Sequence, residues 1–329
     1  MPESIWLWIG FLGFIGAMLV IDLGIFSKGS HEVKLREAAS WTIVWIALAL
    51  LFDLGLYLYW GLIAPSSELN NQQSSLAFLA AYLIEYSLSV DNIFVFVLLF
   101  SFFAVPAAYQ HRVLFWGILG ALVMRGLMIT VGAALIEQFH WILYLFGAFL
   151  LYTGIQLARS GGEEQVDPEK NILLRMARRF FPITEEYVSD HFFTVQNGVR
   201  MATPLLLVLL VVESTDLVFA LDSIPAIFAI TTEPYIAFTS NIFAILGLRS
   251  LYFLLANMMR SFHYLQVGLA IILSFVGVKM LIEDLYEIPI LASLGVIVVV
   301  FAVSVIASIL WPPAEGVEAA EAAAGHQHK

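Results

Sequence analysis

Two matched acidic clusters lie inside long apolar segments of the chain. In each, a carboxylate is followed by five other residues, an aspartate and then a small polar residue. The two sets are Glu85, Asp91 and Asn92, and Asp216, Asp222 and Ser223. Carboxylates inside a bilayer are costly, so they usually face a cavity, pair with a partner and mark an ion path. Two matched sets therefore suggest an internal duplication with a binding site between its halves.

The residues that could hold a metal all offer oxygen atoms. The candidate ligands are Glu85, Asp91, Asn92, Glu213, Asp216, Asp222 and Ser223. Oxygen-rich sites suit Mg²⁺, Ca²⁺ and Mn²⁺, whereas Cu(I) and Zn²⁺ favour sulfur or imidazole. The chain has no cysteine, which excludes thiolate metal sites and thiol redox chemistry. No histidine is expected in the middle of a span, since His111, His140, His191 and His263 fall in loops or at span ends.

Three basic side chains in the same apolar segments offset part of this negative charge. They are Arg125, Arg249 and Lys279. Against the five core carboxylates among the candidates they leave 5 − 3 = 2 negative charges, which one divalent cation would balance. Without that cation a buried acidic cluster should take up protons, so metal binding would expel protons, as proton-for-metal exchange requires. Alternatively, Arg125 and Arg249 lock the two clusters together as structural salt bridges.

The composition is that of a multi-pass membrane protein. Of the 329 residues, 61% are hydrophobic and only 12% are charged, and the mean hydropathy is +0.90. A soluble domain carries about half apolar and about a quarter charged residues. Because a helix needs about 20 apolar residues to cross a bilayer, we predict an all-α fold with about nine transmembrane helices. The predicted spans are 5–26, 39–61, 75–103, 113–136, 141–159, 201–230, 239–257, 265–285 and 290–311.

Loop charge predicts how the spans are oriented. Lysine and arginine occur only in alternate loops, so the positive-inside rule puts the N-terminus outside and the C-terminus in the cytoplasm. We expect a transmembrane domain over 1–313, with a cytoplasmic loop at 160–200, and a disordered, alanine-rich acidic tail over 314–329. Within the loop, 171–181 is typical of a basic amphipathic helix on the inner headgroups, with regulation or partner docking as the alternative.

The two acidic clusters fall on spans that cross the membrane in opposite directions. Matched motifs on such spans predict an inverted repeat, 75–159 against 201–285, a recurrent transporter architecture. Further pairs keep the same order, because Arg125 matches Arg249 and Gly154 matches Gly277. We expect the site at the interface of the two repeats.

The spans that carry the acidic clusters are each near thirty residues, longer than a straight crossing needs. We therefore expect each to be tilted, or broken near its cluster. Pro225 gives a cause in the second, since it cannot donate to the carbonyl of Leu221, just before Asp222. Glu213 and Asp216 share a helix face, but Asp222 joins them only where the helix unwinds or bends.

Ser240 and Asn241 are polar residues inside the span 239–257. We expect them to form interhelical hydrogen bonds, with lining of the ion path as the alternative.

Three stretches of the chain resemble the TerC family of membrane proteins, and within it the Alx-type members. The stretches are YLIEYSLSVDN at 82–92, VESTDLVFALDSIPAIFA at 212–229 and TSNIFAILGLRSLYFL at 239–254, within a likeness that extends from about 38 to 311. The resemblance implies a bacterial inner-membrane protein that exports manganese. It also implies a metal site at Glu85, Asp91, Glu213, Asp216 and Asp222. Relatives are linked by name to tellurite resistance and to thylakoid membrane assembly, for which the sequence offers no chemical basis.

The sequence thus favours an exporter of Mn²⁺, coupled to protons and working by alternating access between the repeats. One alternative is transport of Ca²⁺ or Mg²⁺, which oxygen ligands alone do not exclude. Another is a membrane-assembly or stress-response scaffold that moves no ion and acts through the 160–200 loop. We expect no enzyme activity, cofactor or nucleic-acid partner; the net charge of −11 does not itself decide the last point.

Overall fold

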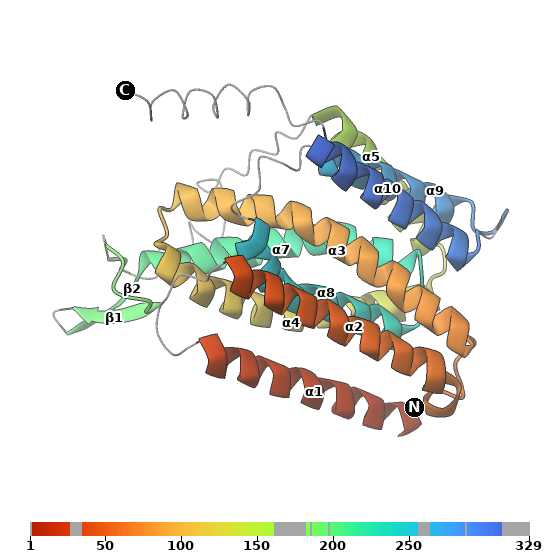
Figure 1. Ribbon diagram of the computed structural model, residues 1–329, viewed down its shortest axis with the longest axis horizontal. Coiled ribbons are helices and arrows are strands. Elements are labelled where there is room, and N and C mark those ends of the chain that lie inside the picture. Colours follow the sequence, from red (N-terminus) through yellow and green to blue (C-terminus); the bar gives the residue numbers. More distant parts are fainter. Residues whose placement is uncertain are drawn as a thin grey trace.

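The computed structural model is a bundle of long helices with one small hairpin at its end (Figure 1). It describes residues 2–26, 35–160, 182–184, 186–196, 198–255, 264–286 and 288–310. The helices are α1 (Pro2–Phe26), α2 (Leu35–Ile63), α3 (Asn71–Phe102), α4 (Ala107–Gln138), α5 (Ile142–Ser160), α7 (Pro204–Phe228), α8 (Pro234–Leu255), α9 (Leu265–Leu281) and α10 (Ile290–Leu310). Each predicted span falls on one of them, which confirms the all-α prediction.

Most of these helices have the length and composition of membrane spans. Among the described residues, seven helices are long and apolar enough to cross a bilayer, while α9 and the segment Ile5–Val20 of α1 are shorter apolar helices. Local signals place their ends. Asn70 and Gln73 form a capping box that opens α3, in which each side chain bonds the other's backbone N–H. Pro204 occupies the first position of α7, where its missing N–H costs nothing.

Four helices form the centre of the bundle. Helices α3 and α4 each pack against both α7 and α8. Helix α2 covers α3 and α8, and α10 covers α3 and α9. Helices α5, α9 and α10 gather on one side, while α1 lies at the opposite edge (Figure 1). Helix α8 is the most enclosed of the candidate spans, with 89% of its apolar window buried, so its polar residues face protein instead of lipid.

The helix pairs are symmetric in the way that the predicted repeat requires. Exchanging α3, α4 and α5 with α7, α8 and α9 maps the α3–α8 contact onto α7–α4, and α5–α7 onto α9–α3. Helices α5 and α9 also meet reciprocally. A Cβ added at Gly154 would lie 2.8 Å from the backbone nitrogen of Ser274, and one at Gly277 would lie 2.6 Å from that of Leu151, its counterpart. These contacts support the inverted repeat, which stays a prediction.

Neither long helix is broken at its acidic cluster, so that alternative was wrong. Helix α3 is continuous through Glu85 and Asn92, and α7 is continuous through Asp216 and Asp222. Pro225 lies only three residues before the last residue of α7, so one donor is lost close to the helix end. The residues on either side of Pro225 are buried, and their packing holds this final turn in place.

The segment before α7 contains a hairpin that sequence reasoning missed. Strands β1 (Phe193–Gln196) and β2 (Val199–Ala202) pair antiparallel, so the predicted span 201–230 begins with strand residues and becomes helical at Pro204. The Tyr187 hydroxyl donates to the carbonyl of Phe103 at 2.7 Å, and Arg112 pairs with Asp190 at 2.6 Å. These contacts attach the segment to the α3–α4 turn. The predicted basic helix at 171–181 and the tail 314–329 lie outside the described residues.

Candidate functional site

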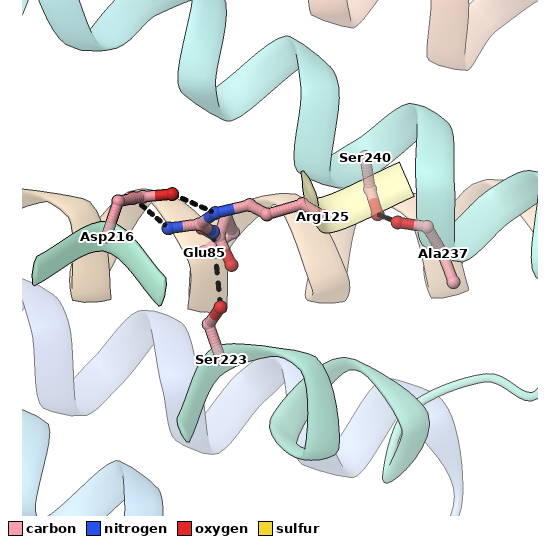
Figure 2. Close-up of polar contacts among 6 residues, drawn as sticks. All are labelled: Glu85, Arg125, Asp216, Ser223, Ala237 and Ser240. Carbon is pink, nitrogen blue, oxygen red and sulfur yellow. Dashed lines mark hydrogen bonds and ion pairs between the residues drawn. The ribbon is translucent and has the colours of Figure 1, made fainter. Parts of the chain in front are cut away.

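A buried arginine joins two of the helices that carry the acidic clusters. Arg125 of α4 is only 1% exposed, and its guanidinium is bonded to Glu85 of α3 through Nη1. Towards Asp216 of α7 it donates from Nη2 to Oδ1 at 2.8 Å and from Nε to Oδ2 at 3.2 Å. The Ser223 hydroxyl accepts a further bond from Nη1 at 3.2 Å. Figure 2 shows the arginine reaching across to all three partners.

Helical spacing explains which predicted residues reach this cluster. Asp216 and Ser223 are seven residues apart, two turns of a continuous helix, so both point to the same side of α7. Asp222 points elsewhere, and Thr153 of α5 donates to its Oδ1 at 3.4 Å. We predicted that Asp222 would join Glu213 and Asp216 only where the helix unwinds or bends. Helix α7 does not unwind, and it does not bring the Asp222 carboxylate to Arg125. Thr153 was not predicted, because only the packing of α5 on α7 reveals it.

The other candidate ligands lie around the cluster. Glu213 of α7 is half-buried against α4, where a Cβ added at Gly120 would collide with its carboxylate. Asn92 is buried on the same face of α3 as Glu85, two turns further on. Asp91 belongs to α3, but its side chain lies outside the described part of the structure.

The three basic residues lie at different places in the bundle. Arg125 binds the carboxylates of the cluster directly. Arg249 is buried in the wall of a cavity of about 20 Å³ that Asp216 also lines. A cavity of that size holds about one water molecule. Lys279 is buried near the end of α9, in the wall of a separate cavity of about 360 Å³. The charge balance predicted for the three is therefore spread over the bundle.

The cluster leaves polar atoms with unmet bonding capacity. In the part of the chain that the structure describes, Oε2 of Glu85 and Oγ of Ser89 are buried with no hydrogen-bond partner. The two residues are one turn apart on α3. Nonetheless, the described residues contain no group of three or more His, Cys, Asp or Glu side chains placed to hold a metal ion. A cation could bind the free Oε2 of Glu85 directly, whereas the other oxygens of Glu85 and Asp216 would first have to exchange their bonds to Arg125.

Long apolar helices that enclose a desolvated carboxylate–arginine cluster define a multi-pass integral membrane protein with charge at its centre. The chain belongs to the TerC family of integral membrane proteins, which matches residues 70–315. This confirms the family that the sequence motifs indicated.

Three relatives cover almost the whole chain. An uncharacterised membrane protein of Myxococcus xanthus is 51% identical over 304 residues, 92% of each chain. A protein of Escherichia coli K12, whose name proposes a membrane-bound redox modulator, Alx, is 50% identical over 292 residues, 88% of this chain and 90% of that one. An uncharacterised membrane protein of Rickettsia bellii is 38% identical over 303 residues. No solved structure matches the chain significantly.

Proposed function

We propose that this protein exports Mn²⁺ across the bacterial cytoplasmic membrane in exchange for protons. The observation that carries the proposal is the ion cluster of Glu85, Arg125 and Asp216, held by three different helices and almost fully buried. Burying several charges in a membrane protein is costly, and such groups typically mark an ion pathway. Carboxylate and hydroxyl oxygens are the ligands that a hard divalent cation prefers.

In this mechanism Arg125 occupies the carboxylates while no metal is bound. Its guanidinium gives one positive charge to Glu85 and Asp216, and a divalent cation would give two in the same place. A metal that used both carboxylates fully would therefore displace the arginine from at least one of them, while Oε2 of Glu85 has no bond to exchange among the described residues. Protons would neutralise the carboxylates on the return step, when the metal has left.

A wide acidic cavity fits the release of a cation at one end of the bundle. The cavity of about 360 Å³ lies between the loops before α3, between α7 and α8, and before α10, and Phe228 and Lys279 also line it. Its carboxylates are those of Glu68, Glu233 and Glu283. The Ser67 hydroxyl donates to Oε2 of Glu233 at 2.9 Å, which joins two of these loops. Negative charge in a concave mouth concentrates cations near it.

The orientation and the choice of metal rest on the sequence. The positive-inside pattern places the acidic cavity on the outer side of the membrane, so it would be the exit. The family resemblance favours manganese over calcium and magnesium. The redox role in the relative's name has no thiol to act through here, because this chain contains no cysteine.

The test is Mn²⁺ flux in sealed proteoliposomes with an imposed pH gradient. Wild type should move Mn²⁺, and reversal of the gradient should reverse the direction of net flux. Glu85→Gln, Asp91→Asn, Asp216→Asn and Asp222→Asn should each lower the flux. Asp190→Asn is the matched control, since Asp190 pairs with an arginine outside the cluster. Folded wild type without flux of Mn²⁺, Ca²⁺ or Mg²⁺ in either gradient would favour the scaffold alternative.

A further inference from the structure

Asn241 of α8 is fully buried, yet its amide has no hydrogen-bond partner in the described part of the chain. The side chain is 0% exposed, and neither Oδ1 nor Nδ2 has a hydrogen bond to any residue that the structure describes. Its neighbours differ. The Thr239 hydroxyl donates to the carbonyl of Tyr235 at 2.8 Å, and the Ser240 hydroxyl donates to that of Ala237 at 3.1 Å, both within α8. Among the described residues, therefore, Ser240 and Asn241 do not form the interhelical hydrogen bonds predicted for them.

An unpaired amide at such a position needs an explanation. A carboxamide offers two donors and an oxygen that accepts two bonds, and buried side chains of this kind nearly always have partners. Leaving the group unpaired in a dry interior is unfavourable, whereas leucine has a similar volume and carries no such penalty. Asn241 is therefore placed for a partner that is not part of the chain, either water or an ion stripped of water.

The surroundings of Asn241 lead to the ion cluster. Ile245, Leu248 and Arg249 line the small cavity beside Asp216, and Asn241 continues their face of α8 by one turn. One turn before Asn241, on the same face, α8 packs against α4. A Cβ added at Gly126, the residue after Arg125, would lie 2.9 Å from the ring of Phe238. Figure 2 shows the adjoining turn of α8, with Ala237 and Ser240, alongside the arginine.

The predicted repeat gives a second, independent position for Asn241. Asn241 precedes Arg249 by eight residues, as Gly117 precedes Arg125. A Cβ at Gly117 would meet Val212 at 3.2 Å, one turn before Asp216 on α7. The equivalent place for Asn241 is against α3 one turn before Glu85, whose Oε2 also lacks a partner among the described residues. The cavity thus leads from Asn241 to Asp216, and the repeat leads from it to Glu85, the two carboxylates that Arg125 joins.

We propose that Asn241 binds the transported divalent cation beside Glu85, its amide oxygen and the carboxylate Oε2 acting as two of the ligands. The inference deepens the proposed function and rests on it. Neutral amide oxygens are common ligands of hard cations, and they coordinate without adding a charge that would hold the ion too tightly for release. The unmet hydrogen bonds of the metal-free structure are then the binding capacity that the cation uses.

The experiment compares Asn241→Leu with Ser240→Ala in the same proteoliposome flux assay. Asn241→Leu should be at least as resistant to thermal unfolding as wild type, because it removes unpaired polar atoms, while Mn²⁺ flux falls at least ten-fold. Ser240→Ala alters a neighbouring residue of equal burial and should leave flux unchanged. Asn241→Leu that folds and transports like wild type would overturn the inference and leave the proposed function standing. Wild type without flux would instead refute the function itself.

A second variant covers the case in which leucine disturbs folding. Asn241→Asp keeps the shape and the ligating oxygen but adds a charge that slows release of the ion, so it should lower Mn²⁺ flux and change the relative flux of Mn²⁺, Ca²⁺ and Mg²⁺ by several-fold. A purely structural asparagine would not affect ion preference. Folded Asn241→Asp with unchanged flux and unchanged preference among the three cations would count against a ligand role.

Discussion

Replacing Arg125 with methionine tests whether the ion cluster is as tightly coupled as its geometry indicates. The change removes the bonds to Glu85, Asp216 and Ser223 and leaves two carboxylates, 0% and 4% exposed, without their counter-charge. Breaking a buried ion pair by removal of one partner typically costs about 3–5 kcal/mol. We expect a loss of this size for Arg125→Met, measured by reversible unfolding in bicelles or mixed micelles.

A triple variant and a matched control extend the test of Arg125→Met. Neutralising the carboxylates as well, in Glu85→Gln/Asp216→Asn/Arg125→Met, should recover most of the lost stability, because no uncompensated charge then remains buried. Arg112→Met removes an arginine whose pair with Asp190 is partly exposed, with side chains 33% and 26% exposed, so it should cost less than about 1 kcal/mol. Arg125→Met within about 1 kcal/mol of wild type would refute the reasoning, as would a triple variant that recovers nothing.

Two further predictions concern the contact between α5 and α9 and the ion pair of Asp190 with Arg112. Gly277→Ala should destabilise the α5–α9 contact by about 1–3 kcal/mol, because the new methyl group would meet backbone atoms that cannot turn away; Gly13→Ala, with nothing within 4 Å, should be neutral or slightly stabilising in the same unfolding assay. Partial burial would raise the pKa of Asp190, but the hydrogen bond and charge of Arg112 hold this pKa below its ordinary value of 3.8. The pair therefore stabilises the fold above that pH and is lost as the pH falls through the lowered pKa. The small stability difference between wild type and Asp190→Asn at pH 7 should accordingly shrink below about pH 4; a difference that persists unchanged at lower pH would contradict this origin.

The helices were predictable because their signal is strong and local. Long apolar runs specify membrane helices, and the polar breaks between them specify the turns. The hairpin over 193–202 was missed because its strands are only four residues long, too short for a clear alternating pattern in the sequence. The expectation that Pro225 would break α7 near Asp222 was wrong for another reason. Pro225 removes one hydrogen bond, but packing around the last turn of α7 outweighs that local preference.

The sequence predicted which residues form the ion cluster better than it predicted the bonds between them. Residue types and spacing indicated Glu85, Asp216 and Arg125, since charge in an apolar segment is conspicuous. That Arg125 would bind the carboxylates of both motifs, and that Asp222 would contact Thr153 instead, depends on how helices far apart in the chain pack together. For Asn241 the sequence favoured an interhelical hydrogen bond, and only the packed interior reveals its amide as unpaired.

The reciprocal glycine contacts between α5 and α9 bear on the energy balance of a transport cycle. Gly154 approaches Ser274 as Gly277 approaches Leu151, so the two sides of this interface are nearly equivalent. If the two halves of the protein exchange conformations, this interface ends with the same set of contacts that it began with. The α5–α9 interface would then favour neither end state, and it could stay fixed while the two halves move around it. A carrier whose empty forms are close to isoenergetic can be driven either way by a modest ion gradient.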